Sequence, residues 1–148
     1  MVLRAIAACA LACAVASSAG AKDVCVGLDF AVGATLLLKG IPGKGSFGPV
    51  DGYINFPSPT NGADRLGPVT GQAIVSSAGD LVLGLTWHEV ALGASGGTNV
   101  LNDLIAIHLA CHPGSDGKLG IDDVCETFVD DEDGAGQLIS CKSVAPVP

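Results

Sequence analysis

The chain has 148 residues, the size of a single domain, and contains 15 acidic against 7 basic residues, giving a net charge of −8. This charge argues against nucleic acids and anionic membrane surfaces as partners, because both are bound through basic patches. Charged residues make up only 15% of the chain, so we expect Gly, Ser, Thr, Asn and Pro to form much of the surface.

The first 21 residues resemble an export signal rather than part of the fold. Arg4 supplies a positive start, residues 6–16 are apolar, and residues 19–21 form a small-residue cleavage site. Cleavage there would leave a single domain, residues 22–148, with a net charge of −9. We therefore expect a secreted or periplasmic protein whose mature chain has no membrane span.

Two other uses of this segment remain open. It could be retained as a membrane anchor, but its apolar run is shorter than the roughly 20 residues that a span needs. It could also carry a lipid on Cys9, which follows small residues with the required spacing but too short an apolar run. Cleavage remains the favoured interpretation.

Four cysteines remain in the mature chain: Cys25, Cys111, Cys125 and Cys141. An even number in an exported chain predicts two disulfides, and no close pair of the C-x2-C type indicates a metal site. We favour Cys111–Cys125, which brackets one turn, together with Cys25–Cys141, which would tie the first strand to the last. The pairs Cys125–Cys141 and Cys25–Cys111 are the alternative.

Alternating apolar residues and glycine-rich turns predict a series of strands. In chain order we expect them over residues 23–39 (with a bulge or turn at Gly33), 50–56, 69–77, 81–92, 98–111, 124–129 and 137–144. Loops are expected at 40–49 and 57–68, and acidic turns before and after 124–129. The pattern predicts an all-β antiparallel meander of about seven or eight strands, forming a small sandwich or barrel.

Residues 81–92 and 98–111 are two long apolar segments among these strands. In 81–92 the apolar face of Leu81, Leu83 and Leu85 continues to Trp87, which we expect to be the central core aromatic rather than a ligand-stacking residue at a rim. Residues 98–111 fit a strand or one short helix, and the neighbouring strands favour the strand.

Ser95 stands in a G-x-S-x-G sequence at residues 93–97, which matches the nucleophile elbow of serine hydrolases. The hydrolase fold needs a parallel sheet with crossover helices, which hairpin spacing does not supply. The triad would also have to take Asp103 with His108 or His112 from the same element. We therefore interpret 93–97 as a hairpin turn and expect no catalytic site.

The histidines and the acidic turns are the candidate metal ligands. His88, His108 and His112 lack the glutamate of the H-E-x-x-H zinc motif. Residues 122–133 contain seven acids, and oxygen-rich turns suit calcium, although the D-x-D-x-D-G pattern does not fit. The calcium candidates are Asp130, Asp131 and Asp133, and a solvated acidic turn is the favoured interpretation.

Together these patterns predict an exported bacterial β-domain without a cofactor, with a binding or structural role. Two alternatives remain: a calcium-dependent surface module using residues 122–133, and a small serine hydrolase using Ser95. If the fold is a barrel with an open mouth, a carrier of a small molecule is the favoured role.

Overall fold

The computed structural model describes residues 21–57, 64–92, 98–99, 104–130 and 132–144. Within these ranges the chain forms ten strands and one turn of 3-10 helix. In chain order they are β1 (Lys22–Leu28), β2 (Thr35–Ile41), β3 (Ser46–Phe56), β4 (Asp64–Val75), β5 (Leu81–His88), β6 (Val90–Leu92), β7 (Thr98–Asn99), β8 (Leu104–Cys111), β9 (Val124–Val129), β10 (Glu132–Ile139) and η1 (Cys141–Ser143).

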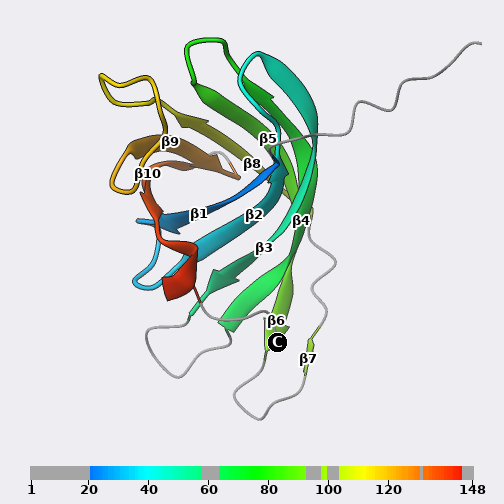
Figure 1. Ribbon diagram of the computed structural model, residues 1–148. Coiled ribbons are helices and arrows are strands. Elements are labelled where there is room, and N and C mark those ends of the chain that lie inside the picture. The colour runs from blue at the N-terminus through cyan, green and yellow to red at the C-terminus, as the bar shows by residue number, and fades with distance from the viewer. Residues whose placement is uncertain (1–20, 58–63, 93–97, 100–103, 131, 145–148) are drawn as a thin grey trace, which may run out of the picture.

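Eight of these strands close into an antiparallel barrel (Figure 1). Around the wall, β1, β2, β3, β4, β5, β8, β9 and β10 each pair with the next, and β10 pairs back onto β1 with Cys25 opposite Ile139. The short strands β6 and β7 extend the start of β4 and project beyond the wall. The predicted all-β meander is confirmed, and its form is a barrel rather than a sandwich.

The barrel interior is filled by alternate residues of each strand, as a pleated wall requires. In β5 the buried positions are Leu81, Leu83, Leu85 and Trp87, and the residues between them face outward. Trp87 is 1% exposed and heads the largest fully buried side chains. Each fully buried aliphatic side chain contributes about 1.5–3 kcal/mol, so this alternation is the main source of stability in the wall.

Residues 104–111 form strand β8, so the alternative of a helix over 98–111 is wrong. The apolar residues of this segment fit both the two-residue repeat of a strand and the 3.6-residue repeat of a helix. In the structure, β8 lies between β5 and β9 and forms hydrogen bonds with both. A helix here would leave the facing edges of those two strands without partners, which closed pairing avoids.

Several predicted boundaries also differ from the structure. The segment 23–39 does contain the break expected at Gly33: a turn in which Gly33 has φ +80° divides it into β1 and β2. The strands β3, β4 and β10 begin four to five residues earlier than predicted, at Ser46, Asp64 and Glu132. Their first residues include Gly, Asp and Glu, which composition assigns to loops, whereas cross-strand pairing holds them in the sheet.

The two ends of the barrel are built differently. At the end that we call the far end, Cys111 is bonded to Cys125 between β8 and β9, and the Lys44 ammonium donates to the carbonyl of Gly117. At the end that we call the mouth, β1 turns into β2, β3 ends, β4 begins, and β9 turns into β10. The interior near the far end is filled with buried side chains, so any internal space must lie toward the mouth.

The second disulfide, Cys25–Cys141, ties β1 to the short helix that follows β10, with Cα atoms 5.2 Å apart. The structure therefore brings together the same two pairs that the sequence favoured. Paired cysteines indicate an oxidising, non-cytoplasmic environment. In the part of the chain described above, no helix has the length and apolar character needed to span a membrane.

Candidate functional site: a cavity at the barrel mouth

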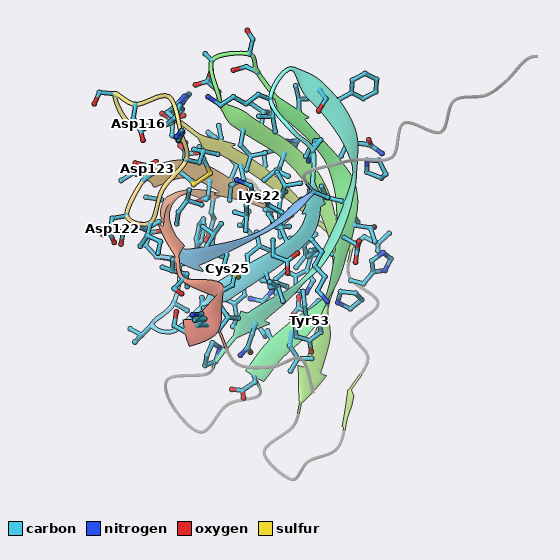
Figure 2. The ribbon with its side chains drawn as sticks, in the orientation of Figure 1. Lys22, Cys25, Tyr53, Asp116, Asp122 and Asp123 are labelled. Carbon is cyan, nitrogen blue, oxygen red and sulfur yellow. A yellow bond between two sulfur atoms is a disulfide. The ribbon has the colours of Figure 1, made fainter. Side chains whose placement is uncertain are left out.

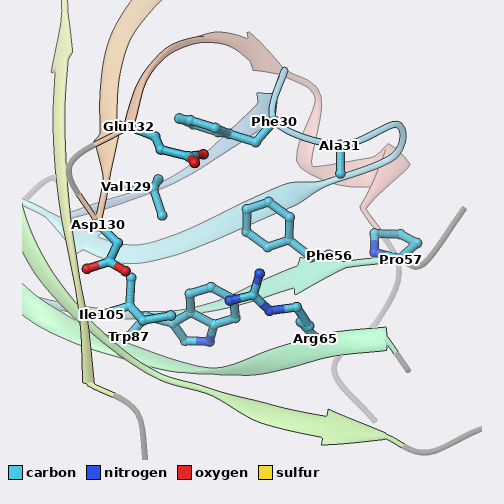
Figure 3. Close-up of a pocket in the computed structure, with 10 residues that line it drawn as sticks. All are labelled: Phe30, Ala31, Phe56, Pro57, Arg65, Trp87, Ile105, Val129, Asp130 and Glu132. Carbon is cyan, nitrogen blue, oxygen red and sulfur yellow. The ribbon is translucent and has the colours of Figure 1, made fainter. Parts of the chain in front are cut away.

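A cavity of about 370 Å³ lies at the mouth of the barrel (Figure 3). We call it the mouth cavity. It is lined by Phe30, Ala31, Phe56, Pro57, Arg65, Trp87, Ile105, Val129, Asp130 and Glu132. These residues come from the ends of seven segments of the wall, so the cavity exists only once the barrel has closed.

Three aromatic rings define the walls of the cavity. Phe56 stacks on Trp87 with ring centroids 5.3 Å apart and an angle of 16° between the planes. Phe30 reaches in from the turn after β1 and lies against Gly134 of β10. A Cβ atom at Gly134 would lie 2.4 Å from the ring of Phe30, so glycine at this position allows the ring to occupy the mouth.

Arg65 is the only basic residue among those lining the cavity. Its guanidinium lies 5.3 Å from the centre of the Trp87 ring, where it makes a cation–π contact. It also forms a two-point ion pair with Glu89, in which Nε donates to Oε1 and Nη2 donates to Oε2 at 2.8 Å. The side chain of Glu89 is only 2% exposed, whereas that of Arg65 is 52% exposed.

This ion pair neutralises both of its members and fixes the guanidinium beside Trp87. A buried carboxylate that loses its partner is strongly destabilising, so Arg65 is held by Glu89 rather than free to reach a ligand. The pair also anchors the start of β4 to the residue that separates β5 from β6. It is therefore both a structural clamp and part of the cavity wall.

Two carboxylates, Asp130 and Glu132, remain at the cavity. Figure 3 shows the Glu132 carboxylate directed toward the space between the rings of Phe30 and Phe56. Within the described ranges, neither acid has a basic partner at ion-pair distance. Because the charges of Arg65 and Glu89 cancel, the net charge of the groups at the cavity is negative.

Two buried polar atoms lack a hydrogen-bond partner among the described residues: Trp87 Nε1 and Thr127 Oγ1. Trp87 Nε1 lies beside Gly67 of β4, since a Cβ at that glycine would be 3.1 Å from it. Thr127 is fully buried and faces inward, two residues along β9 from the cavity residue Val129. Most buried polar groups in proteins are hydrogen-bonded. At and below the mouth cavity, two buried polar atoms are therefore left able to form a hydrogen bond with another molecule.

Three other hollows of the described surface have similar volumes, 390 to 430 Å³. Among the residues that line them, only Phe128 is aromatic, and it lies on the outer wall with Ala106 and His108. The mouth cavity is the one in which several rings and charged groups converge, and small-molecule sites have this character.

The acidic residues predicted as calcium ligands lie in two separate places. Asp122 and Asp123 belong to the loop before β9, at the far end (Figure 2). Asp130 and Asp133 follow β9 at the mouth, and a six-residue strand spans about 20 Å. Asp131 lies outside the described residues. Within those residues, no three His, Cys, Asp or Glu groups gather as metal ligands, and the calcium module stays an untested alternative.

Ser95 and Asp103 also lie outside the described residues. His88 and His108 face outward from β5 and β8. His112 is at the far end, where its Nδ1 lies 3.0 Å from Asp80 Oδ1. Hydrogen bonds from His112 and Ser76 lower the pKa of Asp80, so this pair belongs to the far-end turns and is remote from the mouth.

Sequence reasoning missed most of this site. Arg65 and Glu89 fell in a predicted loop and a predicted continuous strand, and neither was a candidate. Counting back by two from the buried Val69 places Arg65 on the inward face of β4, and this alternation was the available signal. Comparison with family models, curated proteins and solved structures finds no match to the chain.

Proposed function

We propose that the protein binds a small, partly apolar molecule in the mouth cavity and performs no catalysis on it. The observation that carries this proposal is the convergence of Phe30, Phe56 and Trp87 around about 370 Å³ of space at one end of a barrel whose interior is otherwise filled. Small-molecule sites are of this size and occur in the mouths of barrels.

The division of the barrel into a packed half and a hollow mouth supports the same role. Side chains buried in the middle and at the far end hold the wall rigid, for example Leu83, Ile107 and Leu109. A rigid wall keeps the cavity formed without a ligand, so little conformational entropy is lost on binding. Trp87, which lines the cavity, also has a buried Nε1 without a hydrogen-bond partner among the described residues, and this supports a binding role.

We also propose that the protein acts outside the cytoplasm, as a secreted or periplasmic protein. Support comes from the signal-like residues 1–21 and from the two cysteine pairs. The exported chain is expected to start at Lys22, and its intact mass measures this. A retained N-terminus, or a diacylglycerol adduct on Cys9 or Cys13, would contradict it.

Binding can be tested by NMR with benzyl alcohol, an uncharged aromatic probe. We expect the backbone amide shifts on titration to be confined to segments that line the mouth cavity. Ala31→Phe should abolish them, because Ala31 lines the cavity from a turn that can accept a larger side chain. The matched control is Ala106→Phe, which adds the same group to the outer wall.

Two results would overturn the proposal. One is a set of shifts scattered over the outer wall. The other is binding that is the same in Ala31→Phe as in the parent, provided that both variants retain the far-ultraviolet spectrum and melting behaviour of the parent. If neither benzyl alcohol nor the probes introduced in the next subsection cause a shift, the cavity does not bind small molecules and the structural role becomes the leading interpretation.

A further inference from the structure

We infer that the molecule held in the mouth cavity is a small organic cation, such as a quaternary or protonated amine. This inference rests on the binding function proposed above. It follows from three features of the mouth taken together: the sign of its unpaired charge, the engagement of Arg65, and the aromatic walls.

The charge at the mouth is strongly one-sided. Among the described residues, the acids on this side besides Glu89, which is paired with Arg65, include Asp29, Asp130, Glu132 and Asp133. The described part contains six of the chain's seven basic residues, and of these only Arg65 lines the cavity. The lysines lie elsewhere: Lys22 begins β1 at the far end, Lys39 is on β2, Lys44 and Lys118 are in far-end turns, and Lys142 is in η1.

An anionic ligand would therefore have to recruit Arg65. That guanidinium already donates twice to the carboxylate of Glu89, whose side chain is 2% exposed. Turning Arg65 toward a ligand would leave a buried carboxylate without its partner, which is strongly destabilising. The mouth thus disfavours anions even though it contains an arginine.

The same cavity favours a cationic ligand. Glu132 directs its carboxylate toward the space between Phe30 and Phe56, as Figure 3 shows. Aromatic faces attract cations through the ring quadrupole, and quaternary ammonium groups are recognised by aromatic walls of this kind. The Arg65–Trp87 contact already shows one ring of the site holding a cation. The rings of Phe30 and Phe56, next to an acid, offer the same interaction to a ligand.

Charge preference can be measured with three probes of one shape. They are choline, its uncharged isostere 3,3-dimethylbutan-1-ol, in which a tert-butyl group replaces the trimethylammonium group, and 3,3-dimethylbutanoate as the anion. We expect choline to bind about tenfold more tightly than the uncharged isostere, and the anion to bind most weakly. Affinities come from NMR titration, with the fluorescence of Trp87, the only tryptophan, as a second readout.

Glu132→Gln should reduce the affinity for choline about threefold to tenfold and leave the affinity for the uncharged isostere unchanged. The matched control is Glu126→Gln, which removes the same charge from the exposed outer face of β9, and it should change the choline affinity less than twofold. A control variant with the same effect as Glu132→Gln would mean that only overall charge matters, which overturns the inference.

The probes also separate failure of this inference from failure of the binding function. Equal binding of choline and its uncharged isostere, or tighter binding of the anion, overturns the cation preference and leaves the binding function intact. The same holds if only benzyl alcohol binds. If neither benzyl alcohol nor any of the three probes binds, both proposals fail together.

Discussion

Removing the Arg65 guanidinium should be among the most destabilising single changes at the barrel mouth. In Arg65→Met the side chain keeps its apolar stem but leaves the Glu89 carboxylate, 2% exposed, without a partner. Breaking a buried ion pair in this way destabilises by about 3–5 kcal/mol. Because Arg65 is itself half exposed, water can enter the space it leaves, and we expect a value near the lower limit, about 3 kcal/mol.

Removing the other member of the ion pair should cost less stability. In Glu89→Gln the half-exposed guanidinium can turn toward water, so we expect a loss of about 1–2 kcal/mol, the usual range for a lost hydrogen bond to a charged group. The double variant Arg65→Met/Glu89→Gln contains no buried charge and should lie close to Glu89→Gln. The coupling energy between the two sites then equals the loss in Arg65→Met, about 3 kcal/mol.

The assay is urea unfolding with both disulfides intact, followed by the fluorescence of Trp87 and by far-ultraviolet circular dichroism. A loss of about 3 kcal/mol is a large part of the 5–15 kcal/mol that stabilises a typical domain and should lower the midpoint clearly. If the free energy of unfolding of Arg65→Met is within 1 kcal/mol of the parent value, or if the two changes are additive, then the ion pair does not hold the mouth together and Glu89 does not keep Arg65 from a ligand.

Two further predictions concern other parts of the barrel. Trp87→Ala should destabilise by about 3–5 kcal/mol, while the emission of parental Trp87 should be blue-shifted and weakly quenched by iodide; the spectrum of a solvated indole would contradict its burial. Because the pKa of Asp80 is lowered from 3.8, its charge stabilises the fold above about pH 4, and this contribution is lost as pH falls. Asp80→Asn should therefore lower the melting temperature near neutral pH and reduce its fall between about pH 5 and pH 2, and a pH dependence identical to that of the parent would contradict this.

The fold class could be predicted because alternation is a local property. Leu81, Leu83, Leu85 and Trp87 repeat at a period of two, and the structure buries all four. Strand starts such as Asp64 were missed because Asp and Gly are assigned to loops by composition. The place of Asp64 in the sheet depends on its pairing with β6, a partner that adjacent residues do not reveal.

The form of the sheet depended on one contact that no local pattern encodes. A meander of eight strands can fold into two layers or close on itself, and only the pairing of β1 with β10 decides between them. The favoured cysteine pair Cys25–Cys141 pointed to that contact, because it would join the first strand to the last. The spacing of the cysteines alone left the alternative pairing equally allowed.

The site was harder to predict than the fold, because its residues have no motif. Phe30, Phe56, Arg65 and Glu89 come from four separate segments, and each resembles an ordinary surface or turn residue when read alone. The local motif that was visible, around Ser95, lies outside the described residues. The chemistry of the cavity arises from closure of the wall and could be read only from the arrangement of the strands.

The pairing of β1 with β10 also has a consequence for the order in which the chain assembles. Six of the eight seams of the barrel join strands that follow one another directly, and a seventh joins β5 to β8 across only the short strands β6 and β7, so all seven can form early as local hairpins. The eighth must wait for the last strand, and until then β1 and β10 present unpaired edges that invite association with other chains. The Cys25–Cys141 bond, between residues 116 positions apart, can form only after that wait. Its oxidation therefore marks the moment at which an individual molecule has finished folding.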